Sequence, residues 1–557
     1  MDINIKLHFD DRKRYAWYQQ KAEDKEIWVS GSGFLNGLFL NAESLAKTFL
    51  HNGKLTFGTF KEKIKALNGN FIVIVRDGGS CIAAVDHIRS IPLFYVNKGN
   101  RFYISDRALW IREKCDCLIP DKLSRDEFLC TGYVTGQDTL FENIKQLQAG
   151  ECLYLGGAED GESIFKKERY YRYLSHKLSH KPIDTLIDEL DKVTQNVFER
   201  LVSGVNGRTI VVPLSGGLDS RLVASMLKRA GYDNVICFSY GRKNNKDSLK
   251  SERIAKALGY KWFFVEYSER KWREWYNHND FRSYFNSADN LSSLPHIDDW
   301  AAVKELRDNA LIPDNAVFVP GHTGDFISGG HLKYIFDSTK KLTEKELVTN
   351  IMQKHYGLWP VKLKDKDLNA MLKRKIRNSL RDLKKETVQD MASSYEYWEW
   401  QERQSKFIVN SVRVYDFWGY DWRLPLWDVE FMDFWKDMLY GFKLNKKLYT
   451  RYLADSDKYG LFNPKMDRKS LAGMLMENIY KRRNIPFLRW ILRYYHLYKK
   501  FLDYFKDDLA RYGIYGYTAF IKNLTKTKHI NSLLTRCYLN NITKFHEGCY
   551  AEDTRHY

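Results

Sequence analysis

The sequence predicts an α+β N-terminal region of stacked antiparallel sheets, an α/β region built on a parallel sheet, and a helical C-terminal extension. Three observations support this order. Short apolar runs alternate with turn residues up to about residue 170, strands alternate with amphipathic helices from Pro182, and the chain then becomes mainly helical and rich in Trp and Tyr. A length of 557 residues also favours two or more domains. We therefore expect domains at 1–175 and 182–455, followed by an extension at 456–557.

The N-terminal strands are predicted from apolar segments that end in turn signals. Examples are NFIVIVRDGG at 70–79, SCIAAVDH at 80–87 and GECLYLGG at 150–157. A further segment, IPLFYVNKGNRFYISD at 91–106, has Lys-Gly-Asn between two apolar runs, which is typical of a hairpin. These segments indicate antiparallel pairing.

The second domain begins with a long amphipathic helix over 183–204, where apolar residues recur at spacings of three and four. RTIVVPL at 208–214 is a predicted buried strand, and SRLVASMLKRAG at 220–231 is the helix that follows it. NVICFSYG at 234–241 and KWFFVEY at 261–267 are further strands, separated by another helical segment. This alternation predicts a doubly wound parallel sheet.

The turn between the first strand and helix of this domain reads SGGLDS, from Ser215 to Ser220. Two glycines let the backbone fold closely around an anion, and the helix that follows directs its free N–H groups at the same point. The two serines offer hydroxyl donors, and Asp219 offers a carboxylate for Mg²⁺. The turn is of neither the Walker nor the dinucleotide-binding type.

The SGGLDS turn resembles the pyrophosphate-binding loop of the ATP pyrophosphatases, and further segments are similar to the glutamine-hydrolysing asparagine synthetase family of class II amidotransferases. FVPGHTGDFISGGH at 318–331 resembles the second signature of that family, WRLPLWD at 422–428 its Arg-x-Pro-Phe-Leu-Asp segment, and NKKLYTRYL at 445–453 its Lys-x-x-x-Arg segment. The resemblance implies ATP and Mg²⁺ as cofactors. The implied nucleotide-binding residues are Ser215, Gly216, Gly217, Leu218, Asp219, Ser220, Phe238, Ser239, Gly321 and Gly324.

The same resemblance implies Mg²⁺ ligands at Asp219 and Asp325 and a phosphate-binding cation at Lys447. His322 stands where the family has its catalytic Glu, so it is the expected base or substrate-positioning residue; a structural loop histidine is the alternative. The relatives of this family include the β-lactam synthetases and the lasso-peptide cyclases. The β-lactam synthetases also vary this position.

The N-terminal region resembles the glutaminase domain of the family at 67–77, 85–96 and 138–155. This implies an Ntn-hydrolase-like αββα fold. The glutaminase nucleophile of the family is an N-terminal Cys whose own amino group acts as the base. Here residue 2 is Asp2 and no Cys precedes Cys81. We expect a degenerate domain that does not hydrolyse glutamine.

The expected function is an asparagine synthetase-like C–N ligase that forms AMP and pyrophosphate. It would adenylate a small-molecule carboxylate, with uronic acids or surface-polysaccharide precursors as one substrate class. Ammonia or an amine would supply the nitrogen, from solution or from a partner protein. The alternatives are ring-closing amide synthesis, tRNA modification by an enzyme with the same type of loop, and a non-catalytic assembly subunit. The sequence also allows a homodimer.

The net charge of +19 raises the question of nucleic-acid binding, but Lys and Arg alternate with acids over most of the chain, so no nucleic acid is expected. The exception is a basic and aromatic block at 480–506, which predicts helices with a solvated basic face. A contact between this block and an anionic ligand or membrane surface is the alternative. No apolar stretch is long enough to span a membrane, and the N-terminus lacks a signal-peptide pattern, so we expect a cytoplasmic protein.

Overall fold

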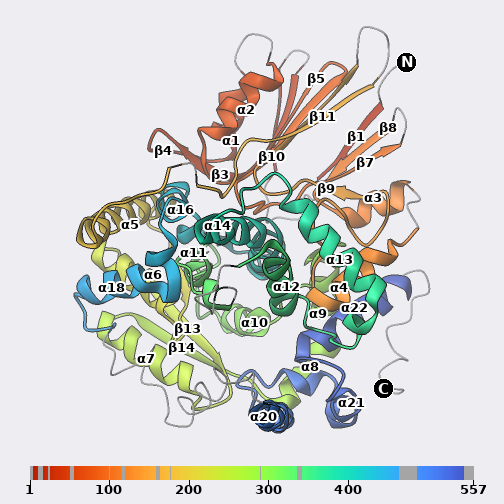
Figure 1. The fold of residues 1–557 in the computed structure, drawn as a ribbon. Helices are drawn as coiled ribbons and strands as arrows, with labels where there is room; N and C mark the ends of the chain where they lie inside the picture. The colour runs from red at the N-terminus through yellow and green to blue at the C-terminus, as the bar shows by residue number, and fades with distance from the viewer. Residues whose placement is uncertain are drawn as a thin grey trace.

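The computed structural model describes residues 4–544 apart from the gaps 10–16, 23–24, 51–54, 99–100, 116–118, 158–162, 176, 289, 335, 337–341 and 463–485. Antiparallel sheets form the top of the molecule in Figure 1, and the parallel strands and most helices lie below them. Asp2 and residues 480–485 of the basic block lie outside the described residues.

Two packed sheets make up the N-terminal domain. The larger sheet has the order β11-β10-β6-β5-β3-β2, with β4 also paired to β3. Its strands are β2 Tyr18–Ala22, β3 Lys25–Leu35, β4 Leu38–Leu40, β5 Asn68–Asp77, β6 Ser80–Val85, β10 Glu151–Gly157 and β11 Ser163–Arg169. The smaller sheet has the order β1-β8-β7-β9. Its strands are β1 Asn4–His8, β7 Phe94–Lys98, β8 Arg101–Ser105 and β9 Lys145–Gln146.

Helices cover both outer faces of this sandwich. Helices α1 (Ala42–Phe49) and α2 (Phe57–Lys65) pack on the larger sheet, and α3 (Ala108–Cys115) packs on β7 and β8. The apolar layer between the sheets includes Ile72, Ile74 and Ile104. The predicted stacked antiparallel arrangement is confirmed, with one exception: β1 pairs with β8 in parallel. Strand β1 belongs to the opposite sheet from β2, the next strand in the chain, so no hairpin fixes its direction.

The second domain contains the predicted parallel sheet, in the order β14-β13-β12-β15-β16, and all four pairings are parallel. Its strands are β12 Ile210–Pro213, β13 Val235–Gly241, β14 Lys261–Glu266, β15 Val317–Phe318 and β16 Asp421–Trp422. Central strand β12 is buried on both faces, which explains its continuous apolar run. The first helices of this domain are α5 Ile183–Val205, α6 Leu218–Arg229, α7 Lys246–Leu258, α8 Glu269–Asn277, α9 Asn279–Ala288, α10 Trp300–Asp308 and α11 Gly324–Ile327.

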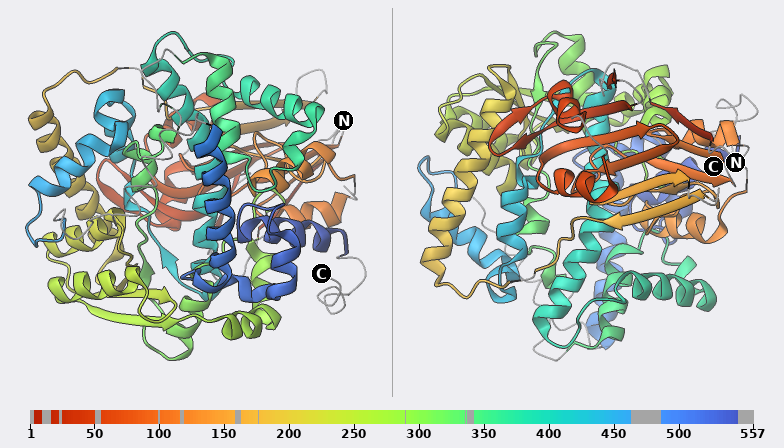
Figure 2. Two further views of the ribbon diagram at one scale, coloured as in Figure 1. Left: turned by 60° about the horizontal axis from the view of Figure 1, so that its bottom comes forward. Right: turned by 90° about the horizontal axis from the view of Figure 1, so that it is seen from above.

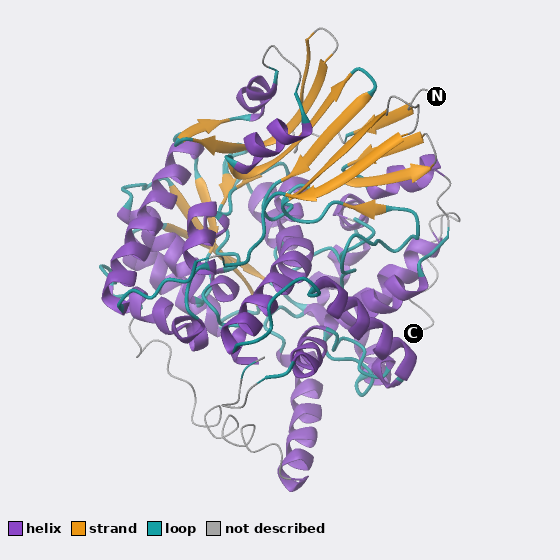
Figure 3. Cartoon of the chain, turned by 45° about the horizontal axis from the view of Figure 1, so that its top comes forward, coloured by secondary structure: helices purple, strands orange, loops and turns teal. Residues whose placement is uncertain are grey.

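Helices dominate the rest of the chain, as predicted. They include α12 Glu344–His355, α13 Lys366–Ser379, α14 Val388–Glu399, the π-helix η3 Trp400–Ile408, α15 Arg413–Trp418, α16 Val429–Lys436, α17 Tyr440–Lys443 and α18 Lys447–Asp455. The C-terminal elements are α20 Pro486–Lys506, the short 3₁₀ helix η8 Arg511–Ile514, α21 Gly516–Asn523 and α22 Ile530–Lys544. Helix α20 extends beyond its neighbours (Figure 3). Among the described residues, none of the helices has the length and apolar character needed to cross a bilayer.

One continuous core joins the two domains, because a single cluster of buried side chains runs from Ile88 to Ile542. Two polar contacts fix the same junction. The Trp400 indole donates to the carbonyl of His87 (3.0 Å), and the Arg413 guanidinium donates to that of Ser90 (2.8 Å). Figure 2 shows the sheets and helices closely apposed from two further directions. The N-terminal domain is therefore an integral part of the structure.

Candidate functional site

The first part of the site is the turn between β12 and α6. Gly217 caps the helix without a side-chain hydrogen bond, so the first N–H groups of α6 remain available to an anion. The turn is shaped by its own hydroxyls: the Ser215 N–H donates to Ser220 Oγ (3.1 Å), and the Gly217 N–H donates to Ser215 Oγ (3.1 Å). The buried Arg221 guanidinium donates to the Gly216 carbonyl (2.5 Å). The six predicted residues 215–220 thus form one turn, and anion binding by this turn stays a prediction.

A second loop, 319–323, packs directly on the start of α6. A Cβ added to Gly321 would lie 2.5 Å from the Ser220 nitrogen, and one added to Gly324 would lie 2.4 Å from Asp219 Cγ. Both distances are far below van der Waals contact, so these positions accept glycine alone without displacement of the backbone or of Asp219. The close approach brings Asp325, at the start of α11, next to Asp219.

Asp219 and Asp325 form an acidic pair with unequal surroundings. The Tyr449 hydroxyl donates to Asp219 Oδ1 (3.0 Å). Burial raises the pKa of Asp219 to about 6 and outweighs the positive charge of Lys446, which lowers this pKa. The negative charge of Asp325 raises it further. Burial also acts to raise the pKa of Asp325, yet hydrogen bonds from His331 and Lys446 hold it well below its usual range. Among the described residues, Lys446 pairs with Asp325, and the only side chain that donates a hydrogen bond to Asp219 is neutral. The carboxylate of Asp219 could therefore accept a further cation.

The cation beside this pair is Lys446, whose ammonium group pairs with Asp325 Oδ1. The side chain of Lys447 is exposed, and its ammonium lies over the Phe442 ring, 5.9 Å from the centroid. The physical reason is local: Asn445 and Lys446 both have left-handed backbones (φ 57° and 59°), which turn the chain just before α18. The structure thus brings Lys446, and not Lys447, to the acidic pair.

A buried network continues from Asp325 into the helical region. His331 bridges two carboxylates, with Nε2 3.1 Å from Asp325 Oδ2 and Nδ1 2.5 Å from Glu399 Oε1. Glu399 is fully buried at the end of α14 and also contacts the Lys354 ammonium (3.3 Å) and the Tyr395 hydroxyl. The sequence did not predict four residues of this site, which are Lys446, Tyr449, His331 and Glu399. His331 directly follows the glycine pair of the second signature, but nothing in the sequence connects it with Glu399, 68 positions later.

His322 lies in the second loop, between the two tightly packed glycines. Its Nε2 is 3.3 Å from the Ser411 hydroxyl, and among the described residues no hydrogen-bond partner meets its buried Nδ1. Burial lowers the pKa of His322 to about 4, in spite of the negative charge of Asp299. The ring is consequently neutral at physiological pH, which is the protonation state that a general base requires.

Phe238 and Ser239 lie near the carboxyl end of β13, beside the turn, where ligands of parallel α/β sheets commonly bind. Phe238 is a core residue, and its carbonyl accepts the Leu214 N–H (2.8 Å). The Ser239 hydroxyl is buried without a hydrogen-bond partner in the described part of the chain. The segment after α20 borders this edge, since the carbonyl of Asp508 accepts the Arg242 N–H (2.6 Å).

These features fit ATP and Mg²⁺. The turn supplies an uncapped helix N-terminus for phosphate oxygens, and Asp219 and Asp325 supply carboxylates. No group of three or more His, Cys, Asp or Glu side chains in the described ranges could hold a metal by itself. The two carboxylates suit Mg²⁺, which proteins commonly hold by one or two carboxylates completed by phosphates and water.

A family model described as asparagine synthase matches residues 191–536. No curated protein matches the chain significantly. Among solved structures, the chain is similar to the NH3-dependent NAD synthetase from Campylobacter jejuni, with 17% identity over 36% of this chain and 94% of that one, at a TM-score of 0.19.

Two further structures cover larger shares of the chain. The glutamine phosphoribosylpyrophosphate amidotransferase from B. subtilis has 11% identity, covers 56% of this chain and 64% of its own, and gives a TM-score of 0.19. A structure described as the allosteric regulatory enzyme of purine biosynthesis has 12% identity, covers 55% and 72%, and gives 0.20.

Proposed function

The chain belongs to the asparagine synthase family, and from that premise we propose that it is a ligase that adenylates a substrate carboxylate and transfers nitrogen to it. Family membership indicates ATP-dependent C–N bond formation in general. The observation that carries the specific proposal is the meeting of the uncapped α6 N-terminus with the pair Asp219 and Asp325. This arrangement suits the departure of pyrophosphate, a polyanion that needs both N–H donors and a divalent cation.

In the proposed first step, a carboxylate oxygen of the substrate attacks the α-phosphorus of ATP, the bond between the α- and β-phosphates breaks, and pyrophosphate leaves. Ser215, Ser220 and the first N–H groups of α6 bind the departing phosphates. Asp219 and Asp325 would hold Mg²⁺, which neutralises phosphate charge when bound. Lys446, paired with Asp325, adds a positive charge at the same place.

In the second step, a nitrogen nucleophile attacks the acyl carbon, the carbon–oxygen bond to AMP breaks, and AMP leaves. The nucleophile must lose a proton, and neutral His322 beside Ser411 is the proposed acceptor. An amine within the same molecule would give ring closure by this same chemistry, so the ring-forming alternative differs only in the substrate. Uronic acids and related sugar-linked acids remain the proposed carboxylate class for the intermolecular reaction.

The nitrogen source is proposed to be ammonia or an amine, because the sequence has no cysteine before Cys81 that could match the glutaminase nucleophile of the family. The first cysteine of the chain is Cys81, which is buried in β6. Burial raises the pKa of its thiol to about 12, so the reactive thiolate is not populated at neutral pH. The domain would then serve as a scaffold for the helices that pack on it.

The test is release of AMP and pyrophosphate from ATP and Mg²⁺, measured over a panel of carboxylates that includes aspartate, uronic acids and nucleotide-linked uronic acids. Ammonium, glutamine or simple amines would be the nitrogen donors. We expect AMP formation with ammonium or an amine, none with glutamine, and none for Asp219→Asn. ATP cleavage between the β- and γ-phosphates, or full activity of Asp219→Asn, would contradict the proposal.

A further inference from the structure

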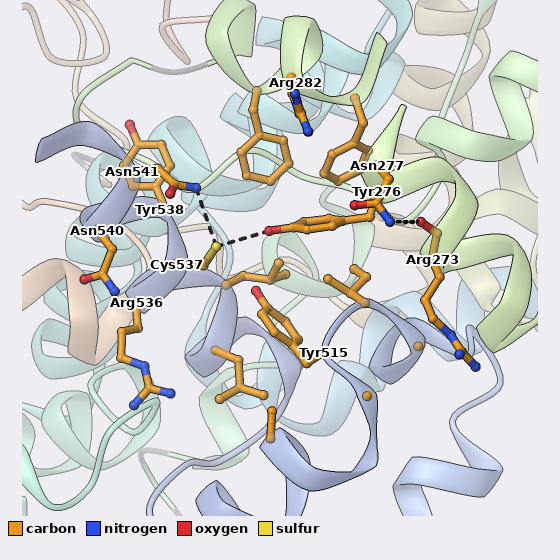
Figure 4. Close-up of a pocket in the computed structure, with 18 of the residues that line it drawn as sticks. Arg273, Tyr276, Asn277, Arg282, Tyr515, Arg536, Cys537, Tyr538, Asn540 and Asn541 are labelled. Carbon is orange, nitrogen blue, oxygen red and sulfur yellow. Dashed lines mark hydrogen bonds between the residues drawn. The ribbon is translucent and has the colours of Figure 1, made fainter. Parts of the chain in front are cut away.

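A cavity of about 350 Å³ lies between helices α8 and α9 on one side and η8, α21 and α22 on the other (Figure 4). We call it the C-terminal pocket. None of its lining residues belongs to the turn 215–220, to the second loop 319–323 or to residues 324–331 that follow it. Its volume lies within the range of small-molecule sites. The pocket is therefore a separate feature from the proposed ligase site.

One wall of the C-terminal pocket is aromatic. The rings of Phe281 and Phe285 on α9 are 4.8 Å apart, and Tyr276 on α8 lies 5.3 Å from Phe281 and 6.4 Å from Tyr515. Leu533 and Leu534 of α22 add aliphatic surface. Apolar surface of this kind binds an apolar body more favourably than water. In Figure 4 the Tyr276 ring lies across the middle of the view, with its hydroxyl directed at Cys537 (3.2 Å).

The charged residues of the wall all have the same sign. Arg273, Arg282 and Arg536 line the C-terminal pocket, and no Asp or Glu among the described residues does. Arg273 and Arg536 lie on opposite sides of the Tyr276 ring, and Arg282 lies above it in Figure 4. Guanidinium groups bind carboxylates and phosphates in a bidentate manner. This distribution favours an anionic group on an otherwise apolar ligand.

The positive character continues beyond the pocket through α22. Arg536 and Asn540 also line a neighbouring, more open hollow of about 550 Å³, together with Lys122, Arg125 and Lys362. The carboxylate of that hollow, on Asp126, is paired with Lys362 at 2.8 Å. Arg536 thus stands between an apolar pocket and a basic surface, as an anionic head group attached to an apolar body would require.

We propose that the C-terminal pocket binds an amphipathic anion, with its apolar body against Phe281, Phe285 and Tyr276 and its phosphate or carboxylate head at Arg536. This site goes beyond the proposed ligase activity and does not depend on it. The ligand would be a second molecule, distinct from ATP.

Calorimetry on the full chain without ATP tests this, with octyl phosphate, octanoate, 1-octanol and inorganic phosphate as probes. We expect one or both anionic amphiphiles to bind at least tenfold more tightly than 1-octanol and inorganic phosphate. Octyl phosphate against octanoate distinguishes the two kinds of head group. Equal binding of all four probes, or no binding of either amphiphile at 1 mM, would overturn the proposal.

Three variants assign any binding to the pocket. Arg536→Gln should weaken the anionic amphiphile at least fivefold, and Arg273→Gln, on the opposite side of the Tyr276 ring, should weaken it less. Arg270→Gln is the matched control, because Arg270 lies on the same helix as Arg273 but is exposed and outside the pocket lining. Arg536 also contacts the Trp359 ring (4.9 Å), so the melting temperature of the Arg536→Gln variant must be compared with that of the parent protein. Unchanged affinity in both pocket variants would locate the binding elsewhere and refute the assignment.

Discussion

At the scale of single residues, adjacent lysines at the start of α18 separate two assignments of the phosphate-binding cation. Lys446 pairs with Asp325, and Lys447 is exposed. We expect Lys446→Met to lower the rate of AMP formation about 100-fold or more, the magnitude found when a charge-stabilising donor is removed. Lys447→Met should stay within about threefold of the parent protein, because exposed lysines contribute little. The reverse order of effects would restore the assignment made from the sequence motif.

His322 gives a second prediction at this scale. A general base must be neutral, and burial lowers the pKa of His322 to about 4. The activity should therefore show no loss from protonation of this ring as pH falls from 8 to about 5.5, whereas an ordinary histidine would lose activity near 6.5. His322→Asn should cost about 10²–10⁴-fold in kcat/KM if the ring takes the proton. A fall near pH 6.5 that disappears in His322→Asn would contradict the buried, neutral ring.

At the scale of elements, the contact between the second loop and helix α6 depends on glycine. A Cβ at Gly324 would lie 2.4 Å from Asp219 Cγ, so Gly324→Ala must displace the carboxylate or the loop. We expect AMP formation to fall at least 100-fold and the free energy of unfolding to drop by about 1–3 kcal/mol, as for other overpacked sites. Gly441→Ala is the control, because a Cβ there meets no atom within 4 Å. If both variants kept full activity, the loop would not be positioning Asp219.

The sequence predicted most elements because their signals are local. The apolar run at 210–212 and the three- and four-residue spacing of 183–204 indicate a buried strand and an amphipathic helix without reference to the rest of the chain. The parallel direction of β1 could not be predicted, since it depends on a distant partner, β8. Lys446 reaches Asp325 only because two residues of the Lys- and Asn-rich turn before α18 have left-handed backbones. The pairing of His331 with Glu399 depends on the packing of α14. Such long-range contacts leave no periodic pattern.

At the scale of the whole molecule, a buried histidine at the domain junction links stability to pH. His87 is 2% exposed and its ring meets the edges of Tyr170 and Tyr171, and burial lowers its pKa from 6.5 to about 3. The unfolded chain therefore binds this proton more readily than the folded one. The resulting stability is complete above pH 6.5 and is lost as pH falls toward 3.

Urea unfolding at several pH values tests this contribution. Between pH 6.5 and 4 the parent protein should lose about 3 kcal/mol more unfolding free energy than His87→Gln, at about 1.4 kcal/mol per unit of pKa shift. Comparison of the two curves removes the contribution of other titrating groups. Parallel curves for the two proteins would mean that His87 does not carry this dependence.

The short helix η8 has a consequence for how the protein would respond to two ligands at once. Arg511 of η8 pairs with Asp298 (2.9 Å), which lies 3.7 Å from His296, and the charge of His296 acts on His322. Gly513 and Ile514 of the same helix line the C-terminal pocket. The segment just before η8 contacts the carboxyl end of β13, because the Asp508 carbonyl accepts the Arg242 N–H. Ligand binding at one site could move η8 and change the affinity of the other site by some factor. Thermodynamic linkage then requires that ligand binding at the second site changes the affinity of the first by the same factor. Titrating ATP with and without octyl phosphate, and octyl phosphate with and without ATP, would then measure the same coupling free energy twice.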